Sequence, residues 1–260
     1  MYNAAQSIEK CLESVRAQTW RGSFEIIIVN DGSTDRSAEV VQEYMARNPD
    51  LDITLIHQQN QGVSKARNVA MERAKGKFVA LLDADDVWLP EKTAKQMLAF
   101  TDERLQIDFL SCLINKEKLR FPYFSKDGLA KVTFRKLLIR NGIASPTAIF
   151  KREILLNTGY FDGDQKFAED HNFWLKISQK NIMYILVENL VIAGNGKRTF
   201  GVSGLSANLT EMEKGFQKNL SDMFRSGRIG FPELLIYSTF YSLKYAFRLL
   251  RNYLYNLKGK

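Results

Sequence analysis

The first half of this sequence predicts an α/β fold in which a mostly parallel, Rossmann-like sheet is flanked by helices. Short apolar runs occupy positions 24–29, 53–56 and 78–82, and segments with helical spacing of apolar residues separate them. Such alternation indicates βαβ units, whose strands run parallel. Each run also ends in polar residues, as expected where the carboxyl ends of parallel strands line a ligand site.

The other elements are predicted from turns and spacing. The first strand leads into the polar turn 30–35 and the second into the turn 57–62, and a helical pattern follows each turn. The second helix is expected to stop at Gly76, because glycine favours helix C-termini. Further along, residues 107–114 are compatible with either a strand or a helix, and residues 145–150 look like an edge strand.

Three carboxylates lie within four positions at the end of the third strand. Asp83, Asp85 and Asp86 are so close that they repel one another unless a cation joins them. Their hard oxygen atoms suit Mg²⁺ or Mn²⁺, which take further ligands from substrate phosphates. Asp83 and Asp85 are expected to point to one side, whereas Asp86 is expected to cap the next turn. A solvated Asp-rich turn is the alternative.

Several short motifs occur in order along the chain. They are Tyr2-Asn3, Asn-Asp-Gly-Ser-Thr-Asp at 30–35, Asn60-x-Gly62 followed by Ala66-Arg67-Asn68, Gly-Lys-Phe at 76–78, and Leu-Asp-Ala-Asp-Asp at 82–86. Gly-Tyr-Phe-Asp at 159–162 and Glu169-Asp170 extend the pattern to about residue 206. Together they resemble family 2 glycosyltransferases of the GT-A fold. A phosphatase-type Asp-x-Asp motif is disfavoured, because it normally ends the first strand of its own fold.

The resemblance implies a nucleotide-diphosphate sugar as the donor. Asp31 would accept a hydrogen bond from the edge of the base, and the alternative is that it orders its own turn. Asp85 would ligate a metal ion that bridges the diphosphate. Asp83 would contribute to the same metal site through a bound water or hold the ribose.

Further donor contacts are expected where the helix after residue 62 begins. Backbone N–H groups near Asn60 and Gly62 can meet phosphate there, together with the side chain of Arg67. For Arg67 a structural ion pair that orders the acid turn is an equal alternative. In the basic, glycine-rich segment near residue 198, Arg198 would neutralise the leaving diphosphate, and a flexible linker is the alternative.

The resemblance places the catalytic base at Asp170, with Glu169 orienting the acceptor or the surrounding structure. An acceptor hydroxyl must lose its proton as it attacks the anomeric carbon, and a carboxylate within hydrogen-bond reach can take it. The alternative is that both acids simply favour the first turn of a helix, where they interact with the helix dipole. His171 is expected to be a packing and hydrogen-bonding residue.

Composition is compatible with one large domain that carries a helical appendage. We expect residues 1–105 to form the nucleotide-sugar-binding part, 106–206 the acceptor-binding part of the same domain, and 207–260 a C-terminal amphipathic helical region. The chain has two cysteines, Cys11 and Cys112, without metal-site spacing, so both are expected to be reduced thiols. Its net charge of +8 comes without a nucleic-acid-binding signature, so we expect no nucleic-acid partner.

The tail at 234–257 is predicted to be an amphipathic helix at a membrane surface. Lys244, Arg248 and Arg251 fall on one helical face, and tyrosines and phenylalanines suit the headgroup boundary. Docking against the catalytic domain or formation of a homodimer is the alternative. No signal peptide opens the chain, so the expected location is cytoplasmic, peripheral on the inner face of the membrane.

The beginning of the chain departs from the family pattern. Family members ordinarily have an apolar strand directly before the Tyr-Asn pair, and this chain begins at Met1-Tyr2-Asn3. Such a strand would be central in the sheet. We therefore expect a sheet that lacks its usual first strand.

The resemblance implies a glycosyltransferase of polysaccharide or cell-envelope glycan synthesis. It would move a sugar, with inversion and with Mn²⁺ or Mg²⁺, from a nucleotide-diphosphate donor to a hydroxyl of a glycan or lipid-linked glycan. Asp170 would remove the proton while the metal stabilises the departing diphosphate. The alternatives are a nucleotidyl or phosphoryl transferase that uses the same acids, and an inactive nucleotide-sugar-binding scaffold.

Overall fold

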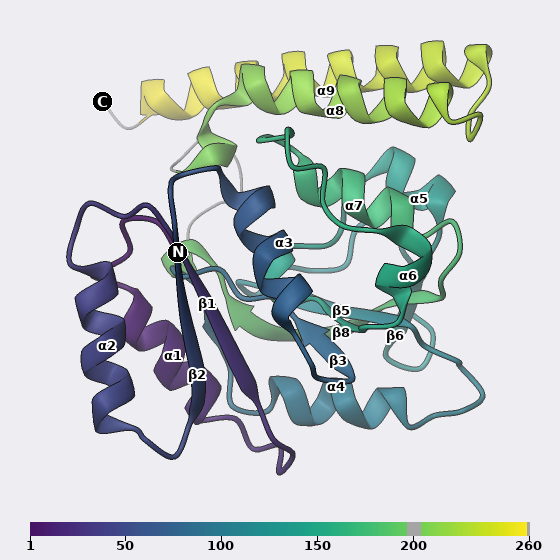
Figure 1. Cartoon of the computed structure of the whole chain (residues 1–260). Coiled ribbons are helices and arrows are strands. Elements are labelled where there is room, and N and C mark those ends of the chain that lie inside the picture. Colours follow the sequence, from purple (N-terminus) through teal and green to yellow (C-terminus); the bar gives the residue numbers. More distant parts are fainter. Residues whose placement is uncertain (197–203, 259–260) are drawn as a thin grey trace.

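Two sheets form the centre of the computed structural model, which describes residues 1–196 and 204–258 (Figure 1). In the smaller sheet, β1 (Glu25–Asp31) runs parallel to β2 (Asp52–Gln58). The larger sheet has the order β3-β7-β5-β8-β4, and β6 also pairs with β8. Its strands are β3 (Phe78–Ala80), β4 (Val87–Trp88), β5 (Phe109–Ile114), β6 (Leu129–Val132), β7 (Ile149–Lys151) and β8 (Met183–Ile192).

The predicted α/β class is confirmed, but the larger sheet is mixed and not mostly parallel. Strands β5 and β8 run parallel, whereas the pairs β3–β7, β5–β7, β4–β8 and β6–β8 are antiparallel. The parallel prediction rested on the βα alternation of the first eighty residues, and it holds for β1 and β2. Beyond β3, long-range pairing sets the strand direction, which local spacing does not encode.

The undecided segment of the second half and the predicted edge strand both contain strands. Residues 107–114 include β5. Residues 145–150 form a 3₁₀ turn (Ser145–Thr147) and most of β7, which lies between β3 and β5, so the prediction of an edge strand is wrong. The side chains of Ile149 and Phe150 are both buried although they point to opposite faces, and this pattern is typical of an interior strand.

Helices pack around both sheets and enclose an aromatic core. In that core the ring of Phe109 lies 4.9 Å from Trp174 and 6.0 Å from Phe150, and all three side chains are fully buried. The helices are α1 (Ile8–Arg16), α2 (Ser37–Arg47), α3 (Val63–Arg73), α4 (Lys92–Phe100), α5 (Phe134–Ile139), α6 (Ile154–Thr158), α7 (Glu169–Ile177), α8 (Leu209–Arg225) and α9 (Phe231–Lys258).

The strands β1 and β3 lie on either side of a cavity and do not pair. Among the described residues no strand fills this position, as expected for a sheet without its usual first strand. The ammonium group of Met1 donates to the carbonyl of Val29 at 2.8 Å, and the N–H of Asp31 donates to the carbonyl of Met1 at 2.9 Å. The cavity has a volume of about 1900 Å³ and extends from here to the acidic residues described below.

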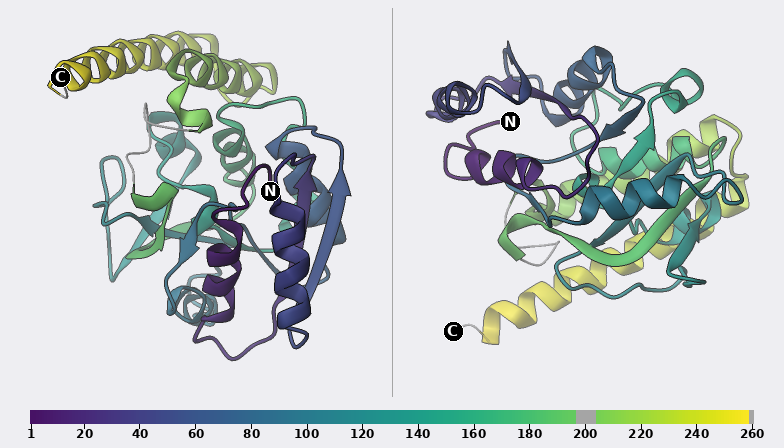
Figure 2. Two further views of the ribbon diagram at one scale, coloured as in Figure 1. Left: turned by 90° about the vertical axis from the view of Figure 1, so that its left-hand side faces the viewer. Right: turned by 90° about the horizontal axis from the view of Figure 1, so that it is seen from below.

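The C-terminal helices α8 and α9 form an antiparallel hairpin that lies across α7 (Figures 1 and 2). The tail prediction needs one correction, because Lys244 and Arg248 line the cavity and do not form an outward basic stripe. Their charged groups lie over aromatic rings, Lys244 over Tyr241 and Arg248 over Phe216. The outward side of α9 instead presents Leu243 and Leu250, which are 66% and 55% exposed. Of the helices in the described ranges, none is both long and apolar enough to span a membrane.

Candidate functional site

The carboxylate of Asp31 orders the loop that opens α3. Asp31 ends β1 and is buried, and it accepts hydrogen bonds from the side chain of Gln58 at 2.7 Å and from the N–H groups of Gln61 and Gly62 at 2.8 and 2.9 Å. Gly62 has a φ of +90°, a conformation that favours glycine. These contacts match the loop-ordering alternative. Asp31 also lines the cavity, so a contact with a base stays a prediction.

The loop passes close to the turn after β1. Gly32 has a φ of +72°, and a Cβ atom there would lie 2.8 Å from the backbone nitrogen of Asn60. The close approach therefore requires glycine at position 32 and brings Asn60 next to Asp31. Both residues line the cavity, as predicted donor contacts should.

The three acids after β3 have different surroundings. Asp85 is exposed, and Asp83 is one-third exposed; both line the cavity. Asp86 is buried and accepts a hydrogen bond from the N–H of Gly194 at 2.7 Å, so the expectation that it caps the next turn is wrong. Burial, aided by the negative charge of Asp83, raises the pKa of Asp86 to about 8. Asp86 therefore fastens the acid turn to the segment that follows β8.

Arg67 joins the acid turn to the start of α7. Its guanidinium donates to Asp83 at 2.7 Å and to Glu169 at 2.9 Å, and only 13% of its side chain is exposed. Burial opposes the charge, but the carboxylates of Asp83 and Glu169 raise the pKa of Arg67 above its ordinary value. With both ends of its fork occupied, Arg67 acts as the structural ion pair that was the alternative to a phosphate contact.

Asp170 lies beside this ion-pair network at the first turn of α7. One carboxylate oxygen accepts from the N–H of His171 at 2.6 Å, and the other accepts from the side chain of Asn141 at 3.2 Å. Burial, followed by the charge of Glu169, raises the pKa of Asp170 above the ordinary carboxyl range. The residue lines the cavity, so its carboxylate is suited to accept a proton near neutral pH.

His171 has the packing role that was predicted. Its ring is buried, Nε2 lies 3.0 Å from the carbonyl of Leu137, and burial lowers its pKa to about 4. It is therefore neutral at physiological pH and is unsuited to a role as a second base.

The loop before α7 is held in place by α3. The side chain of Asn68 forms two hydrogen bonds of 3.0 Å with the backbone of Phe161, one to the carbonyl and one from the N–H. The hydroxyl of Ser64 donates to the carbonyl of Gln165 at 2.7 Å. The same helix therefore supplies Arg67 and fastens the loop that delivers Glu169.

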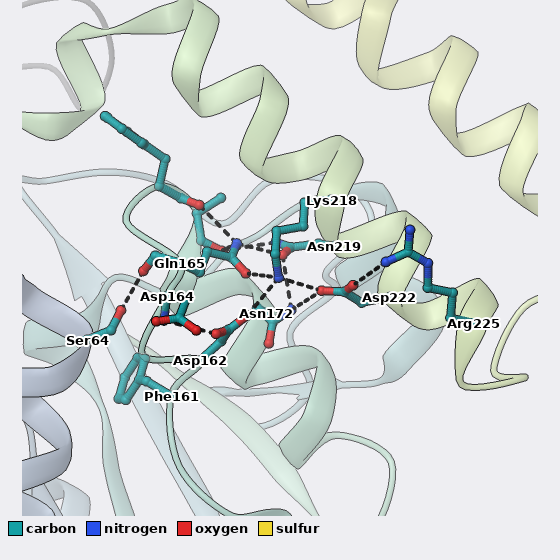
Figure 3. A network of polar contacts seen from close by, with 12 residues as sticks. Ser64, Phe161, Asp162, Asp164, Gln165, Asn172, Lys218, Asn219, Asp222 and Arg225 are labelled. Atoms are coloured by element: carbon teal, nitrogen blue, oxygen red, sulfur yellow. Dashed lines mark hydrogen bonds and ion pairs between the residues drawn. The ribbon is translucent and has the colours of Figure 1, made fainter.

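The helix α8 holds the other side of this loop (Figure 3). The amide of Gln165 donates to the carbonyls of Phe167 and Ala168 and to the side chain of Asn219, at 2.9, 3.2 and 2.8 Å. Asn219 in turn donates to the carbonyl of Ala168 at 3.0 Å. The sequence interpretation missed Gln165 and Asn219. The available signal was that Asn219 falls among the apolar residues of an amphipathic helix.

The acids therefore follow a tightly restrained backbone. Ala168, directly before Glu169, has a φ of +53°, a left-handed conformation that costs ~1–2 kcal/mol for a residue other than glycine. A Cβ atom at Gly215 of α8 would lie 2.3 Å from the carbonyl oxygen of Phe167. The close packing of α8 thus supports the strained entry into α7.

The acid turn suits a divalent cation that is shared with a substrate. Across the described residues no group of three or more His, Cys, Asp or Glu side chains is arranged to hold a metal ion on its own. Asp83 and Asp85 nevertheless supply hard oxygen donors at the cavity. Mg²⁺ and similar ions are often held by one or two carboxylates together with waters and substrate phosphates. This donor set fits such an ion. Arg198 lies outside the described residues.

The N-terminal part of the chain matches a known family. The model of Glycosyl transferase family 2 matches residues 1–158. The uncharacterized glycosyltransferase YibD of Escherichia coli K12 is 42% identical over 107 residues, which cover 41% of this chain and 30% of YibD. The chain also spans 27% and 52% of two Bacillus subtilis relatives, the putative glycosyltransferase EpsH and the uncharacterized glycosyltransferase EpsJ.

Two relatives carry specific names. The Escherichia coli UDP-Glc:alpha-D-GlcNAc-diphosphoundecaprenol beta-1,3-glucosyltransferase WfgD is 30% identical over 181 residues, or 69% of this chain and 68% of WfgD. The poly(ribitol-phosphate) beta-N-acetylglucosaminyltransferase TarS of Staphylococcus aureus is 32% identical over 180 residues, or 67% of this chain and 30% of TarS.

Solved structures confirm the GT-A fold that was expected. TarS residues 1–349 superpose with a TM-score of 0.69 at 24% identity, covering 100% of this chain and 73% of that one. The complex of the same fragment with UDP-GlcNAc superposes with a TM-score of 0.65 at 25% identity, covering 86% of this chain and 64% of that one. The mannosyltransferase PcManGT of Pyrobaculum calidifontis, solved with GDP-Man and Mn²⁺, superposes with a TM-score of 0.70 at 22% identity, covering 98% of this chain and 71% of that one.

Proposed function

Because the chain belongs to Glycosyl transferase family 2, we propose that it transfers a sugar from a nucleotide-diphosphate donor to a hydroxyl of a cell-envelope glycan. The observation that carries the proposal is the double ion pair of Arg67, which joins Asp83 of the acid turn to Glu169 of α7 at one cavity. Relatives support the class of reaction, because WfgD and TarS are named for sugar transfer and a TarS fragment has been solved with UDP-GlcNAc.

The proposed reaction is a single displacement with inversion. The acceptor oxygen forms a bond to the anomeric carbon of the donor, while the bond from that carbon to the diphosphate oxygen breaks. Asp170 takes the proton of the attacking hydroxyl, and its raised pKa makes it a stronger base than an ordinary carboxylate. Asn141 and the N–H of His171 hold the carboxylate, and Glu169 remains in its ion pair with Arg67.

The donor is proposed to lie against the loops at the ends of β1 and β3. Asp31 would face the base, and Asn60 and Gly62 would face the ribose or phosphates. Asp83 and Asp85 would hold Mn²⁺ or Mg²⁺, which supplies positive charge to the leaving diphosphate when bound. Arg67 orders Asp83 through its ion pair and is not expected to contact the donor.

Exposed apolar residues of α9, in place of the basic stripe, are the reason to propose a peripheral membrane location. The outward side chains of α9 include Leu243, Leu250 and Leu254, which are 66, 55 and 48% exposed and recur at helical spacing. We expect Leu243→Ser together with Leu250→Ser to reduce cosedimentation with vesicles that contain anionic lipid. A homodimer that dissociates in this variant, without vesicle binding by the native chain, would contradict the membrane role.

A panel of nucleotide sugars tests the function. We expect one donor to yield nucleoside diphosphate, faster with Mn²⁺ or Mg²⁺ than with EDTA, and faster still with its acceptor. Asp85→Asn removes one anionic ligand while keeping the shape of the side chain, so it should weaken metal-dependent donor binding. Release of pyrophosphate or inorganic phosphate would indicate a nucleotidyl or phosphoryl transferase. Binding of a donor without any turnover would indicate a scaffold protein.

A further inference from the structure

A group of cationic side chains lines the cavity on the side of Asp170. Arg140 precedes Asn141, whose side chain donates to the Asp170 carboxylate, and the ammonium group of Lys244 donates to the carbonyl of Ile139 at 3.0 Å. These contacts connect α9 to the short segment that holds the proposed base. The cavity wall here includes Arg140, Lys244, Arg248 and Arg251 together with Tyr241, and we call these five residues the basic pocket.

Two cations of the basic pocket are bound to backbone carbonyls: Arg140 donates to that of Phe121 at 2.8 Å, and Lys244 donates to that of Ile139 at 3.0 Å. Within the described residues, neither Arg140 nor Lys244 forms an ion pair with a carboxylate. Glu213 is the acid whose charge favours the charged form of Lys244, and it faces several cations. Burial, followed by the charges of Arg248 and Arg140, lowers the pKa of Lys244 to about 8. Lys244 and Arg248 are partly buried, and like charges in such positions cost free energy unless an anion joins them.

Aromatic packing keeps these cations in place. The Lys244 ammonium lies 4.7 Å from the ring centre of Tyr241, and the Arg248 guanidinium lies 5.2 Å from that of Phe216. The Tyr241 side chain is 1% exposed, and its hydroxyl has no hydrogen-bond partner among the described residues although it is buried. A buried hydroxyl without a partner costs free energy that a bound ligand can recover.

We propose that the basic pocket binds a phosphate group of the acceptor, so that the substrate is a phosphate-bearing glycan or lipid. This inference rests on the proposed function, because it takes Asp170 to mark the place of the accepting hydroxyl. Phosphate is the anion that best matches several arginine and lysine donors and a tyrosine hydroxyl around one cavity. The donor diphosphate is expected elsewhere, at the acid turn with its metal.

Binding of simple phosphates to the whole chain tests the pocket without turnover. The probes are 11-phenoxyundecyl phosphate, phenyl phosphate and 11-phenoxyundecanol, titrated by calorimetry in EDTA so that no metal-dependent donor site takes up phosphate. We expect at least one phosphate to bind ~10- to 100-fold more tightly than the alcohol, as for a site with charged hydrogen bonds. Tighter binding of the long-chain phosphate indicates a lipid acceptor, and equal binding of both phosphates indicates a water-soluble one.

Variants show whether the basic pocket is responsible. Arg140→Gln and Lys244→Gln should each lose most of this preference for phosphate, and Tyr241→Phe should lose a smaller part while keeping its ring in the core. Arg225→Gln is the matched control, because Arg225 is 80% exposed on α8. Arg140→Lys should restore binding if charge is the cause, and thermal unfolding checks that each variant is folded.

The proposal is overturned if the alcohol binds as tightly as the phosphates, or if Arg140→Gln and Tyr241→Phe both bind phosphate like the native chain. Displacement of the phosphate probe by a nucleoside diphosphate would also overturn it, because the pocket would then belong to the donor. Donor turnover is measured on the same samples. Turnover of a donor without phosphate binding would contradict the phosphate-binding proposal alone. Phosphate binding without turnover of any nucleotide sugar would contradict the proposed function.

Discussion

The donor side and the acceptor side of the site are built in different ways. Asp31 and Asp83 each lie at or just after the end of a strand, so the strand carries their backbone to the cavity, although their side-chain partners Gln58, Gly62 and Arg67 are 16 to 31 residues away. Asp170 depends on Asn141, which is 29 residues away, and the loop before it depends on Asn219, which is 51 residues from Ala168. Short motifs therefore position the donor chemistry, whereas long-range packing positions the proposed base.

The largest expected change in stability comes from Arg67, the joint between the two sides. Arg67→Met keeps the hydrophobic stem but leaves Asp83 and Glu169 without their cation, and breaking a buried ion pair costs ~3–5 kcal/mol. Because Asp83 is one-third exposed, the loss should fall at the lower end of this range. Urea unfolding measures it.

Arg36→Met provides the control for the two ion pairs of Arg67. Arg36 pairs with Glu39 on the surface, where the two side chains are 72% and 60% exposed. Exposed pairs of this kind contribute far less than a buried pair, because water and salt screen them. Equal losses in the two variants would mean that Arg67 does not hold the two sides together.

A smaller loss is expected at the contact between α8 and the loop before α7. Gly215→Ala would push a methyl group against the carbonyl of Phe167, and overpacking of this kind costs ~1–3 kcal/mol. Transfer should also fall, because the same loop leads into Glu169 and Asp170. Gly230→Ala is the matched control, since its new Cβ atom would meet nothing closer than 3.7 Å. A Gly215→Ala variant with native stability and rate would show that α8 does not position the acids.

The pH dependence of transfer tests the protonation state of the proposed base. A base must be deprotonated to act, so transfer should rise with pH and level off above the pKa of Asp170, which burial and Glu169 raise to about 7. The same shift makes the folded state bind more protons than the unfolded state between about pH 4 and pH 7. Asp170 therefore lowers the free energy of unfolding as pH rises through this window. A rate that levels off near pH 4 would contradict the assignment.

The sequence predicted the position of Asp31 and Asp83 at strand ends for a physical reason. An apolar run that ends in acids places those acids at a strand end whatever the rest of the sheet does, and this holds for Asp31 and Asp83. Strand direction was mispredicted beyond β3, because antiparallel pairing of β7 with β3 and β5 depends on residues that are distant in the chain.

The second half shows where local patterns stop being informative. The side chains of Lys244 and Arg248 fall on one face of α9, but the pattern alone did not tell whether that face meets lipid or the cavity. Likewise, Asp86 was expected to bond locally, and it bonds instead to Gly194, more than a hundred residues away. In each case, the tertiary contact decides the role.

Asp170→Asn tests the central claim most directly, namely that the two sides form one transfer site with Asp170 as its base. Transfer and donor affinity are measured on the native chain, on Asp170→Asn, and on Asp164→Asn as a control from the same loop, where the Asp164 side chain is 92% exposed. We predict that Asp170→Asn slows transfer by ~10²–10⁴-fold with nearly unchanged donor affinity, while the control keeps the native rate. Near-native transfer by Asp170→Asn would contradict the account.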